Sequence, residues 1–325
     1  MTLDTPRQIR LVPARYDELN RYTQIIVDEA LRRDIDVEVR DPARGELALT
    51  CDGHTVTTLE SLSELTSAVA FRRCDDKRYT RLVLERAGIA VPRGRSATFD
   101  QRDELFLHEC DELVVKPARG EQGWGVSVGI RDAAQLQRAI RSAAAVFPDV
   151  LLEERCAGDD LRLVVIGDEV VAAAVRRPPA VVGTGLHTVA ELIELESRQR
   201  ADAIGGSARV PIDPMTLDAV RAGGYDLDDV VPRDAELTIR FNANVHSGGT
   251  IHDVTDELHP ALADVAIRAA RAIDIPVVGL DLLVESVTGP EYVMIEANEQ
   301  PGLANHEPRP TAQRFVDLLF PQTAR

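Results

Sequence analysis

Three side chains near the C-terminal end of the sequence carry oxygen atoms of the kind that bind magnesium. Asp281 opens one apolar run and Glu296 closes another, and the turn-forming residues Thr288-Gly289-Pro290 lie between the two runs. This pattern predicts an antiparallel hairpin, in which Glu296 and Asn298 point to one face and Asp281 can reach the same face. Two carboxylates with one amide suit Mg²⁺, which fills its remaining positions with water and nucleotide phosphate. The alternative interpretation is a solvated strand end.

A glycine-rich segment earlier in the chain indicates a loop that covers phosphate groups. The short apolar strand Leu113–Lys116 precedes it, and a second expected strand, Val126–Ile130, follows it. Its glycines are Gly120, Gly123 and Gly125. A Walker-type phosphate loop and a dinucleotide fold both require a helix directly after the glycines, so both are disfavoured. A hairpin whose tip folds over phosphates fits this order of elements better.

Two lysines lie in contexts that suit phosphate binding. Lys77 follows Asp76, a residue expected to cap a helix, and Lys116 ends the strand before the glycines. An ammonium group in such a place can meet phosphate oxygens as a point charge. One such lysine alone would be interpreted as a surface residue whose stem packs on apolar neighbours. Two of them beside a glycine loop favour phosphate binding.

The acidic segment that follows the expected strand Val150–Glu154 offers contacts for the rest of a nucleotide. Carboxylates here can accept hydrogen bonds from ribose hydroxyls, and the backbone can face an adenine edge. A charged, solvent-exposed loop is the alternative interpretation. The residues concerned are Glu153, Glu154, Cys156 and Asp160.

Arginines and a second glycine loop further along the chain could hold substrate carboxylates. Arg162 and Arg176 lie on the two arms of an expected hairpin whose turn is Gly167-Asp168. Guanidinium groups bind carboxylate and phosphate through two parallel hydrogen bonds, and backbone amides of a glycine pair could hold an acyl-phosphate or an oxyanion. Taken alone, each fits an exposed arginine or a simple turn. The further candidates are Arg240, Asn244, Gly248 and Gly249.

Helical and strand patterns are mixed along the chain, which indicates an α+β or mixed α/β fold. The segment Ser67–Cys74 is small and mixed in character, so we expect a linker there. The stretch Pro178–Asp234 is expected to be irregular apart from one helix. Apolar spacing predicts helices at Tyr22–Arg33, from Asp76 to Ala87, from Asp132, around Thr188–Arg200, at Pro260–Ile273 and from Thr311 to near Phe320.

The composition describes an ordinary globular protein, and 325 residues are enough for two domains. The net charge of −17 argues against nucleic acid or an anionic membrane as the main partner, because both need a positive surface.

Four widely spaced cysteines without a CxxC pair fit reduced thiols. No apolar run approaches the length of a membrane span, and Met1–Arg10 lacks the hydrophobic segment of a signal peptide. We therefore expect a cytoplasmic protein.

The motifs follow one another in a known order. They are DK-x₂-T-x₆-AGI-x-VP, VVKP with the glycine-rich loop, LLEE-x₃-GDDLR, a Gly-Gly loop, GLDLL and IEANEQPG. In this order they resemble the ATP-grasp carboxylate–amine ligases, from about Phe71 to Pro321. The stretch GDDLRLVVIGDEVVAAAVRRPPAVVGTGLHTVAELIE is similar to the central ligase domain of cyanophycin synthetase and to the bifunctional enzymes that make glutathione. ANVHSGGTIHDVTDELHP and IEANEQPGLANHEPRP look closer still to N-acetylglutaminylglutamine synthetase.

The resemblance implies an ATP-grasp fold, with two α+β lobes that grip ATP behind a short N-terminal region. It divides the chain into a reduced N-terminal region over residues 1–70, a small lobe with the glycine-rich lid over 71–152, and a large lobe with the metal and substrate site over 153–325. Members of the last family often carry an N-terminal acetyltransferase module, for which residues 1–70 leave no room. An acetyltransferase acting upstream would then be a separate protein.

The resemblance also implies roles for the matching positions. The ATP phosphates would contact Lys77, Lys116 and the lid Gly120–Gly125. Adenine would lie against the backbone near Glu153 and Cys156, and ribose against Asp160. Two Mg²⁺ ions, with Mn²⁺ as the alternative, would be held by Asp281, Glu296 and Asn298. The acyl-phosphate and the substrate carboxylates would face Arg162, Arg176, Arg240, Asn244, Gly248 and Gly249.

The activity implied is ATP-dependent formation of an amide bond between a carboxylate and an amino-acid or dipeptide amine, by way of an acyl-phosphate. The donor would be an amino acid of the glutamine or glutamate type, N-acetylated in the nearest family. Two alternatives stay open. One is an ATP-grasp enzyme of another chemistry, such as a carboxylase or a ligase that modifies a protein tail. The other is a non-catalytic nucleotide-binding scaffold. The substrates are small molecules, and a homo-oligomer is compatible with the sequence.

Overall fold

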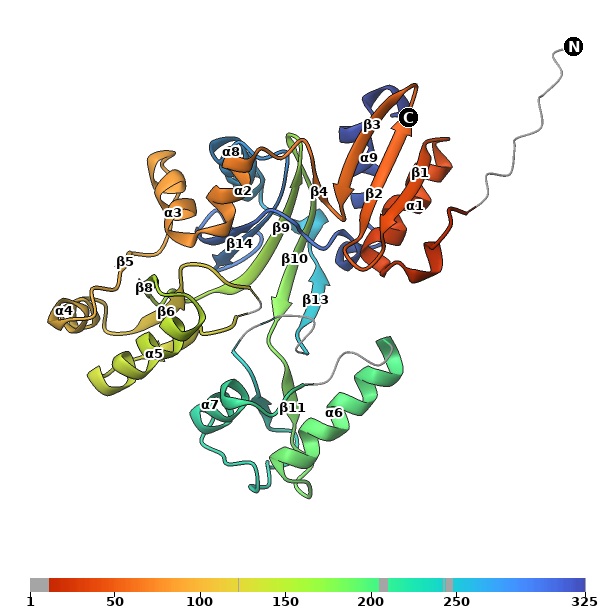
Figure 1. Ribbon diagram of the computed structural model, residues 1–325. Coiled ribbons are helices and arrows are strands. Elements are labelled where there is room, and N and C mark those ends of the chain that lie inside the picture. Colours follow the sequence, from red (N-terminus) through yellow and green to blue (C-terminus); the bar gives the residue numbers. More distant parts are fainter. Residues whose placement is uncertain (1–11, 122, 205–209, 242, 244–247, 325) are drawn as a thin grey trace, which may run out of the picture.

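The computed structural model describes residues 12–121, 123–204, 210–241, 243 and 248–324. Its helices and strands are mixed along the chain, and three smaller groups of elements surround a five-stranded central sheet (Figure 1). The mixed α/β class expected from the sequence is therefore confirmed.

The N-terminal region is a small unit of one long helix on a four-stranded antiparallel sheet. Helix α1 (Arg21–Arg32) begins where the Asn20 side chain accepts a hydrogen bond from the Thr23 amide, and it buries Ile26 and Ala30. A short 3₁₀ helix and the strands of the sheet complete the unit: η1 (Tyr16–Glu18), β1 (Asp36–Asp41), β2 (Glu46–Cys51), β3 (His54–Leu59) and β4 (Leu62–Ser63).

A second sheet, in the order β5-β8-β6-β7, carries the glycine loop between β6 and β7. Asp132 caps the helix behind this sheet, as predicted, because its side chain accepts a hydrogen bond from the Gln135 amide. The elements are β5 (Gly94–Ser96), α4 (Gln101–Cys110), β6 (Leu113–Pro117), β7 (Ser127–Ile130), α5 (Ala133–Val146) and β8 (Val150–Glu154).

The central antiparallel sheet has the order β13-β10-β9-β14-β15 and contains both predicted hairpins. Alternate side chains of the central strands pack on α8. The other face of the sheet is therefore open to polar residues along part of the strands. The elements are β9 (Asp159–Ile166), β10 (Glu169–Arg177), β13 (Thr250–Asp253), η3 (Thr255–Glu257), α8 (Pro260–Ile273), β14 (Val277–Val284), β15 (Tyr292–Asn298), η4 (Leu303–His306), α9 (Thr311–Leu319) and η5 (Pro321–Thr323).

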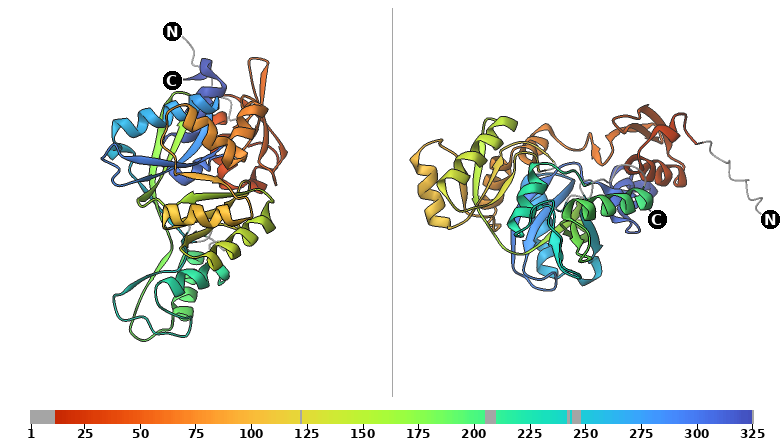
Figure 2. Two further views of the ribbon diagram at one scale, coloured as in Figure 1. Left: turned by 90° about the vertical axis from the view of Figure 1, so that its left-hand side faces the viewer. Right: turned by 90° about the horizontal axis from the view of Figure 1, so that it is seen from below.

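A further unit projects from the central sheet at the lower end of Figure 1, and the left view of Figure 2 shows the same projection. It has a hydrophobic core of its own, which includes Val189, Ile193 and Leu237. The unit corrects the expectation of one helix in an irregular stretch, because it contains two helices and a strand pair. The elements are β11 (Ala180–Val182), α6 (Val189–Ile204), α7 (Pro214–Ala222) and β12 (Glu236–Thr238).

The expected linker at Ser67–Cys74 is wrong, because this segment forms most of helix α2 (Ala68–Asp75). The Ser67 hydroxyl caps the helix by accepting a hydrogen bond from the Ala70 amide. Ala70 and Cys74 enter the core that α8 shares with the central sheet. Only these two side chains of the helix are buried, so its apolar period is too short to be recognised in the sequence.

The hydrophobic cores do not follow the expected boundary at residue 70, because residues 70–91 pack with the central sheet and not with the second sheet. Helices α2 and α3 (Lys77–Arg86) pack into the core of the central sheet. The N-terminal sheet and α1 share another core with α9 and with one end of β9 and β10. Residues 12–66 and the C-terminal helix therefore form one packed body (Figure 1). Within the described ranges, no helix is long and apolar enough to cross a membrane.

Candidate active site

Asp281 and Glu296 lie directly opposite each other on the paired strands β14 and β15. Residues paired across antiparallel strands share a face, and Asn298, two residues beyond Glu296, projects to the same side. The register shifts between Asp281 and Leu282, so a bulge bends the ladder beside the pair. The predicted hairpin is confirmed, and it brings the three candidate metal ligands together. Their metal role stays a prediction.

Two arginines from neighbouring strands hold the Asp281 carboxylate. Arg162 on β9 donates to both of its oxygens, and Arg176 on β10 approaches it to 3.1 Å. The Nη2 atom of Arg176 also donates to Asp160 at 2.7 Å. Burial alone would raise the pKa of Asp281, but the charges of Arg162 and Arg176 outweigh burial and lower that pKa. Asp281 is therefore an anion whose charge is compensated inside the protein.

Lys77 connects the second carboxylate to the glycine loop. Its Nζ atom lies 2.8 Å from Oε1 of Glu296 and donates a hydrogen bond of 2.9 Å to the carbonyl of Gly120. The backbone amide of Lys77 donates to the carbonyl of Ala118, also at 2.9 Å. The first residue of α3 therefore ties the start of the glycine loop to strand β15. The structure thus brings Lys77, a predicted phosphate contact, to a predicted metal ligand.

Lys116 lies in a buried charge cluster of the second sheet. Its Nζ atom is 2.6 Å from Oε2 of Glu153, and Nη1 of Arg81 is 3.6 Å from the other oxygen of that carboxylate. Arg81 was not predicted from the sequence. It follows Lys77 by four residues, so both cations lie on one face of α3, and this spacing is the signal that could have identified it.

Lys77 and Lys116 are the only two lysines among the 37 lysine and arginine residues of the chain. Both side chains are buried, and each faces a glutamate. At every other cationic position the sequence has arginine, whose planar fork of donors is larger than an ammonium group. Lysine at these two buried positions indicates that the site requires a compact point charge, which is the form in which lysine binds phosphate.

The glycine loop between β6 and β7 adopts a backbone that favours glycine. Gly120, Gly123 and Gly125 have φ values of 137°, 79° and 73°, where a side chain would be strained. A Cβ atom on Gly125 would also lie 2.9 Å from the Val146 side chain of α5. Trp124, at 65% exposure, stands out from the loop. The backbone of the loop therefore requires glycine at these positions. Its role as a lid over phosphate stays a prediction.

The residues predicted to face adenine and ribose are partly engaged within the protein. Glu153 is paired with both β5 and β6, and its carboxylate is held by Lys116, so its backbone is not open to an adenine edge. Strand β8 ends at Glu154, which leaves the half-buried Cys156 beyond the ladder. Burial raises the pKa of Asp160 despite its contact with Arg176, and a ribose would have to compete with that contact.

Three of the remaining substrate-side predictions, Arg240, Gly248 and Gly249, lie near the projecting unit. Nη1 of Arg240 donates to Thr216 at 2.8 Å and to Asp213 at 2.9 Å, so its guanidinium holds the start of α7. These contacts do not join Arg240 to Arg162 and Arg176. Gly248 has φ 103°, and a Cβ there would lie 2.7 Å from Val210 and 3.1 Å from Pro179. Gly249 is buried beside it, and Asn244 lies outside the described residues.

His306 is a further candidate that sequence reasoning did not select. It ends η4, which packs against β10, the strand that carries Arg176. Burial, together with the charge of Arg162, lowers the pKa of the imidazole to about 4. The imidazole is therefore neutral near pH 7. The segment LANHEP was part of the motif that carried the family resemblance, but nothing in its sequence showed that the histidine is buried.

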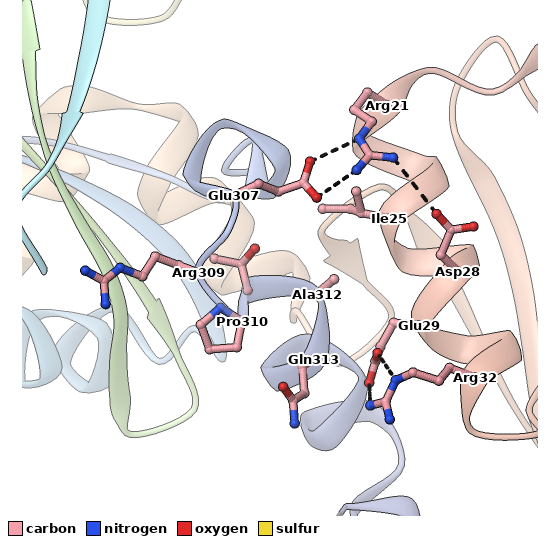
Figure 3. A pocket seen from close by; sticks show the side chains of 11 residues that line it. Arg21, Ile25, Asp28, Glu29, Arg32, Glu307, Arg309, Pro310, Ala312 and Gln313 are labelled. Atoms are coloured by element: carbon pink, nitrogen blue, oxygen red, sulfur yellow. Dashed lines mark hydrogen bonds and ion pairs between the residues drawn. The ribbon is translucent and has the colours of Figure 1, made fainter.

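Two surface pockets lie away from these charged side chains. One, of about 260 Å³, opens between α1 and residues 307–313, where Arg21 pairs with Glu307 (Figure 3). The other, of about 380 Å³, lies along α6 and is lined by residues such as His187 and Arg198. In the part of the chain that the structure describes, no three His, Cys, Asp or Glu side chains form a ready cluster of metal ligands. The metal role of Asp281, Glu296 and Asn298 stays a prediction.

Comparison with known proteins relates the chain to ATP-grasp proteins. Residues 229–312, which include β14 and β15, match the family of RimK-like ATP-grasp domains. The cyanophycin synthetase of a Nostoc species is 31% identical over 277 residues, which cover 80% of this chain and 31% of that protein. The glutathione biosynthesis bifunctional protein GshAB of Listeria innocua is 31% identical over 336 residues, which cover 96% of this chain and 42% of that protein. The chain spans less than half the length of either relative.

Two solved structures have the same fold. The bifunctional glutathione synthetase from Pasteurella multocida aligns with a TM-score of 0.65 at 24% identity, over 94% of this chain and 44% of that one. D-alanine–D-alanine ligase from Bacillus anthracis aligns with a TM-score of 0.52 at 13% identity, over 79% of this chain and 70% of that one. The fold and these similarities define an ATP-grasp protein. Within that class, residues 229–312 match the RimK-like ATP-grasp domain, and the chain is homologous to parts of cyanophycin synthetase and GshAB.

Proposed function

We propose that the chain is an ATP-dependent carboxylate–amine ligase, which joins a substrate carboxylate to an amino-acid amine and releases ADP and phosphate. The observation that carries this proposal is the facing pair Asp281–Glu296, which has arginines on one side and Lys77 with the glycine loop on the other. Anionic substrates and a metal–nucleotide complex could meet at this pair.

The donor set fits magnesium. Asp281 and Glu296 supply hard carboxylate oxygens on one face. The amide nitrogen of Asn298 donates to the carbonyl of Gly279 at 3.3 Å, which leaves its carbonyl oxygen as the atom for a cation. Two Mg²⁺ ions are expected, with Mn²⁺ as a substitute, and when bound they would neutralise the charge that develops on the transferred phosphoryl group.

In the first step, an oxygen of the substrate carboxylate attacks the γ-phosphorus of ATP. The bond from that phosphorus to the bridging oxygen breaks, and ADP leaves. Lys77 and Lys116 would neutralise phosphate charge, while Arg162 and Arg176 would orient the carboxylate as donors. The glycine loop would exclude water, which would otherwise hydrolyse the acyl-phosphate.

In the second step, the amine nitrogen attacks the acyl carbon, phosphate leaves with its bridging oxygen, and the nitrogen loses a proton. The chain needs no covalent nucleophile for this chemistry, because positioning and charge compensation provide the rate enhancement. The same arginines would hold the carboxylate of the acceptor or the phosphate that leaves. Glutamine- or glutamate-type donors, N-acetylated or not, are proposed from the resemblance to N-acetylglutaminylglutamine synthetase.

Mass spectrometry of products tests the proposal. The chain would be incubated with ATP, Mg²⁺ and mixtures of free and N-acetylated amino acids, and both ADP and new amides would be measured. We expect ADP formation that depends on two substrates and equals the amide formed. ADP formation without an amine acceptor would indicate another ATP-grasp chemistry. No ADP formation under any mixture would contradict the proposal.

A further inference from the structure

The N-terminal region makes a set of contacts with one loop of the candidate site. The loop comprises residues 299–307, which begin directly after Asn298 and end after His306. The contacts come from two places, the turn between β3 and β4 and the first turns of α1. Neither place belongs to the ATP-grasp motifs described above, so those motifs assign no role to the N-terminal region.

The turn between β3 and β4 holds the start of the loop. The buried Ser61 hydroxyl donates a hydrogen bond of 2.7 Å to the carbonyl of Pro301. The Glu60 carboxylate accepts hydrogen bonds from Asn20 at 2.7 Å and from Gln300 at 3.2 Å. One carboxylate therefore fixes both the start of α1 and the residue next to Pro301.

Helix α1 holds the end of the loop. The Tyr22 hydroxyl donates to Oδ1 of Asn305 at 2.9 Å, and Arg21 forms a paired contact with Glu307 at 2.7 and 3.0 Å (Figure 3). The Tyr22 ring also lies against Gly302, where a Cβ atom would come within 2.9 Å of it. Gly302 is thus required by the close approach of the ring.

Loop 299–307 connects the N-terminal region with the strand that carries Arg176. Leu303 anchors η4 in the core that the N-terminal sheet shares with α9. The same 3₁₀ helix, η4, packs on β10, which carries Arg176, and the charges of Arg162 and Arg176 help to lower the pKa of the buried His306. Lys116, Glu153 and Arg81 lie on a different sheet and helix. The N-terminal contacts therefore act on the carboxylate-binding half of the site.

We propose that the N-terminal region, residues 12–66, is a positioning element for the carboxylate substrates. Ser61 and Tyr22 are positioning residues, which act through loop 299–307 on Arg162 and Arg176 and do not touch substrate themselves. This inference rests on the proposed ligase function. It assigns to the N-terminal region a larger effect on amino-acid substrates than on the nucleotide.

The kinetic test uses Ser61→Ala and Tyr22→Phe, each of which removes one hydroxyl. Tyr16→Phe is the matched control, because the Tyr16 hydroxyl bonds to Asp28 within the same region at 2.6 Å. We expect the KM for the amino-acid substrate to rise about three- to tenfold in the two test variants, while the KM for ATP stays within about twofold. Equal changes of both constants, or the same pattern in Tyr16→Phe, would overturn the inference.

A second measurement needs no substrate. Hydrogen–deuterium exchange of the full chain would be followed for backbone amides in residues 299–307. We expect faster exchange there in Ser61→Ala and Tyr22→Phe, and unchanged exchange in Tyr16→Phe. Unchanged exchange in the test variants would overturn the inference even if turnover were never found. Absence of any amino-acid-dependent ADP formation by the unaltered chain would contradict the proposed function alone.

Discussion

Asp281 and Glu296 face each other across β14 and β15, yet cations from different parts of the chain hold the two carboxylates. Arg162 and Arg176, from the same sheet, hold Asp281, whereas Lys77, from the start of α3, holds Glu296. The side chain of Asp281 is 10% exposed and that of Glu296 is 29% exposed. The two carboxylates should therefore respond differently to mutation, although both are candidate ligands of the same metal.

Glu296→Gln should separate metal binding from stability. The substitution keeps the shape of the side chain, and Lys77 retains its bond to Gly120. We expect a loss of about 1 kcal/mol in the free energy of unfolding, less than in Asp281→Asn, because Glu296 is partly exposed and the buried Lys77 keeps one hydrogen-bond partner. ADP formation should fall more than about 100-fold. The control is Glu285→Gln, an exposed glutamate on the same hairpin. Near-normal ADP formation in Glu296→Gln would show that Glu296 is not a metal ligand.

Asp281→Asn should lose both activity and stability. Removing this charge leaves Arg162 and Arg176 in a buried cluster with Asp160 as the remaining carboxylate. We expect a loss of about 3 kcal/mol in the free energy of unfolding, measured by urea titration, together with the loss of ADP formation. An unchanged free energy of unfolding would mean that the arginine contacts do not compensate the charge of Asp281.

Variants of Lys116 and Glu153 separate the effect on the free energy of unfolding from the effect on ADP formation. Lys116→Met leaves the buried Glu153 carboxylate without its closest cation and should cost about 3 kcal/mol of stability. We expect Lys116→Met to lose ADP formation as well. The double variant Lys116→Met with Glu153→Gln removes both charges, so we expect the free energy of unfolding to recover while ADP formation remains absent. Recovery of ADP formation with stability would show that Lys116 serves only the fold.

Arg81 should contribute to the affinity for ATP, because it shares the Glu153 carboxylate with Lys116. We expect Arg81→Met to raise the KM for ATP about tenfold, with a smaller effect on the KM for the amino acid. Arg86→Met, at the exposed end of the same helix, is the control and should change neither constant. Equal constants in Arg81→Met and Arg86→Met would remove Arg81 from the nucleotide site.

His306 predicts a specific dependence of stability on pH. Its pKa is about 4 in the folded protein, which is below the usual value of 6.5 in an unfolded chain. Between these values the unfolded state binds more protons, so stability rises with pH across this window and is lost as pH falls toward 4. The contribution is at most about 3 kcal/mol. In urea titrations at several pH values, His306→Gln should flatten the pH dependence between 4 and 6.5. An unchanged slope would contradict the neutral, buried imidazole.

The sequence was informative where chemistry and secondary structure depend on neighbouring residues. Thr288-Gly289-Pro290 between two apolar runs predicted the β14–β15 hairpin, and the side-chain alternation along its strands placed Glu296 and Asn298 on one face. Asp76 and Asp132 were correctly predicted as helix caps, because a cap bonds to an amide two or three residues away. The ATP-grasp fold followed from the order of the motifs.

Contacts between distant segments could not be predicted in the same way. Nothing in the neighbourhood of Lys77 or Glu296 indicates their contact, which depends on how α3 docks on β15. Arg240 was predicted to face substrate, which stays a prediction. Its contacts with Asp213 and Thr216 could not be foreseen, because they come from the start of a helix that was not recognised. The contacts of Ser61 and Tyr22 with loop 299–307 join the two ends of the chain, where local pattern carries no information.

Transfer of oxygen from substrate to phosphate tests the ligase mechanism most directly. Amino-acid mixtures labelled with ¹⁸O in their carboxyl groups would be incubated with ATP, Mg²⁺ and the chain, and the mass of the released phosphate would be measured. If a carboxylate attacks the γ-phosphorus and phosphate later leaves from the acyl carbon, each ADP formed is accompanied by one phosphate that carries a single ¹⁸O. Phosphate without the label, released at the same rate as ADP, would contradict an acyl-phosphate intermediate and with it the proposed ligase.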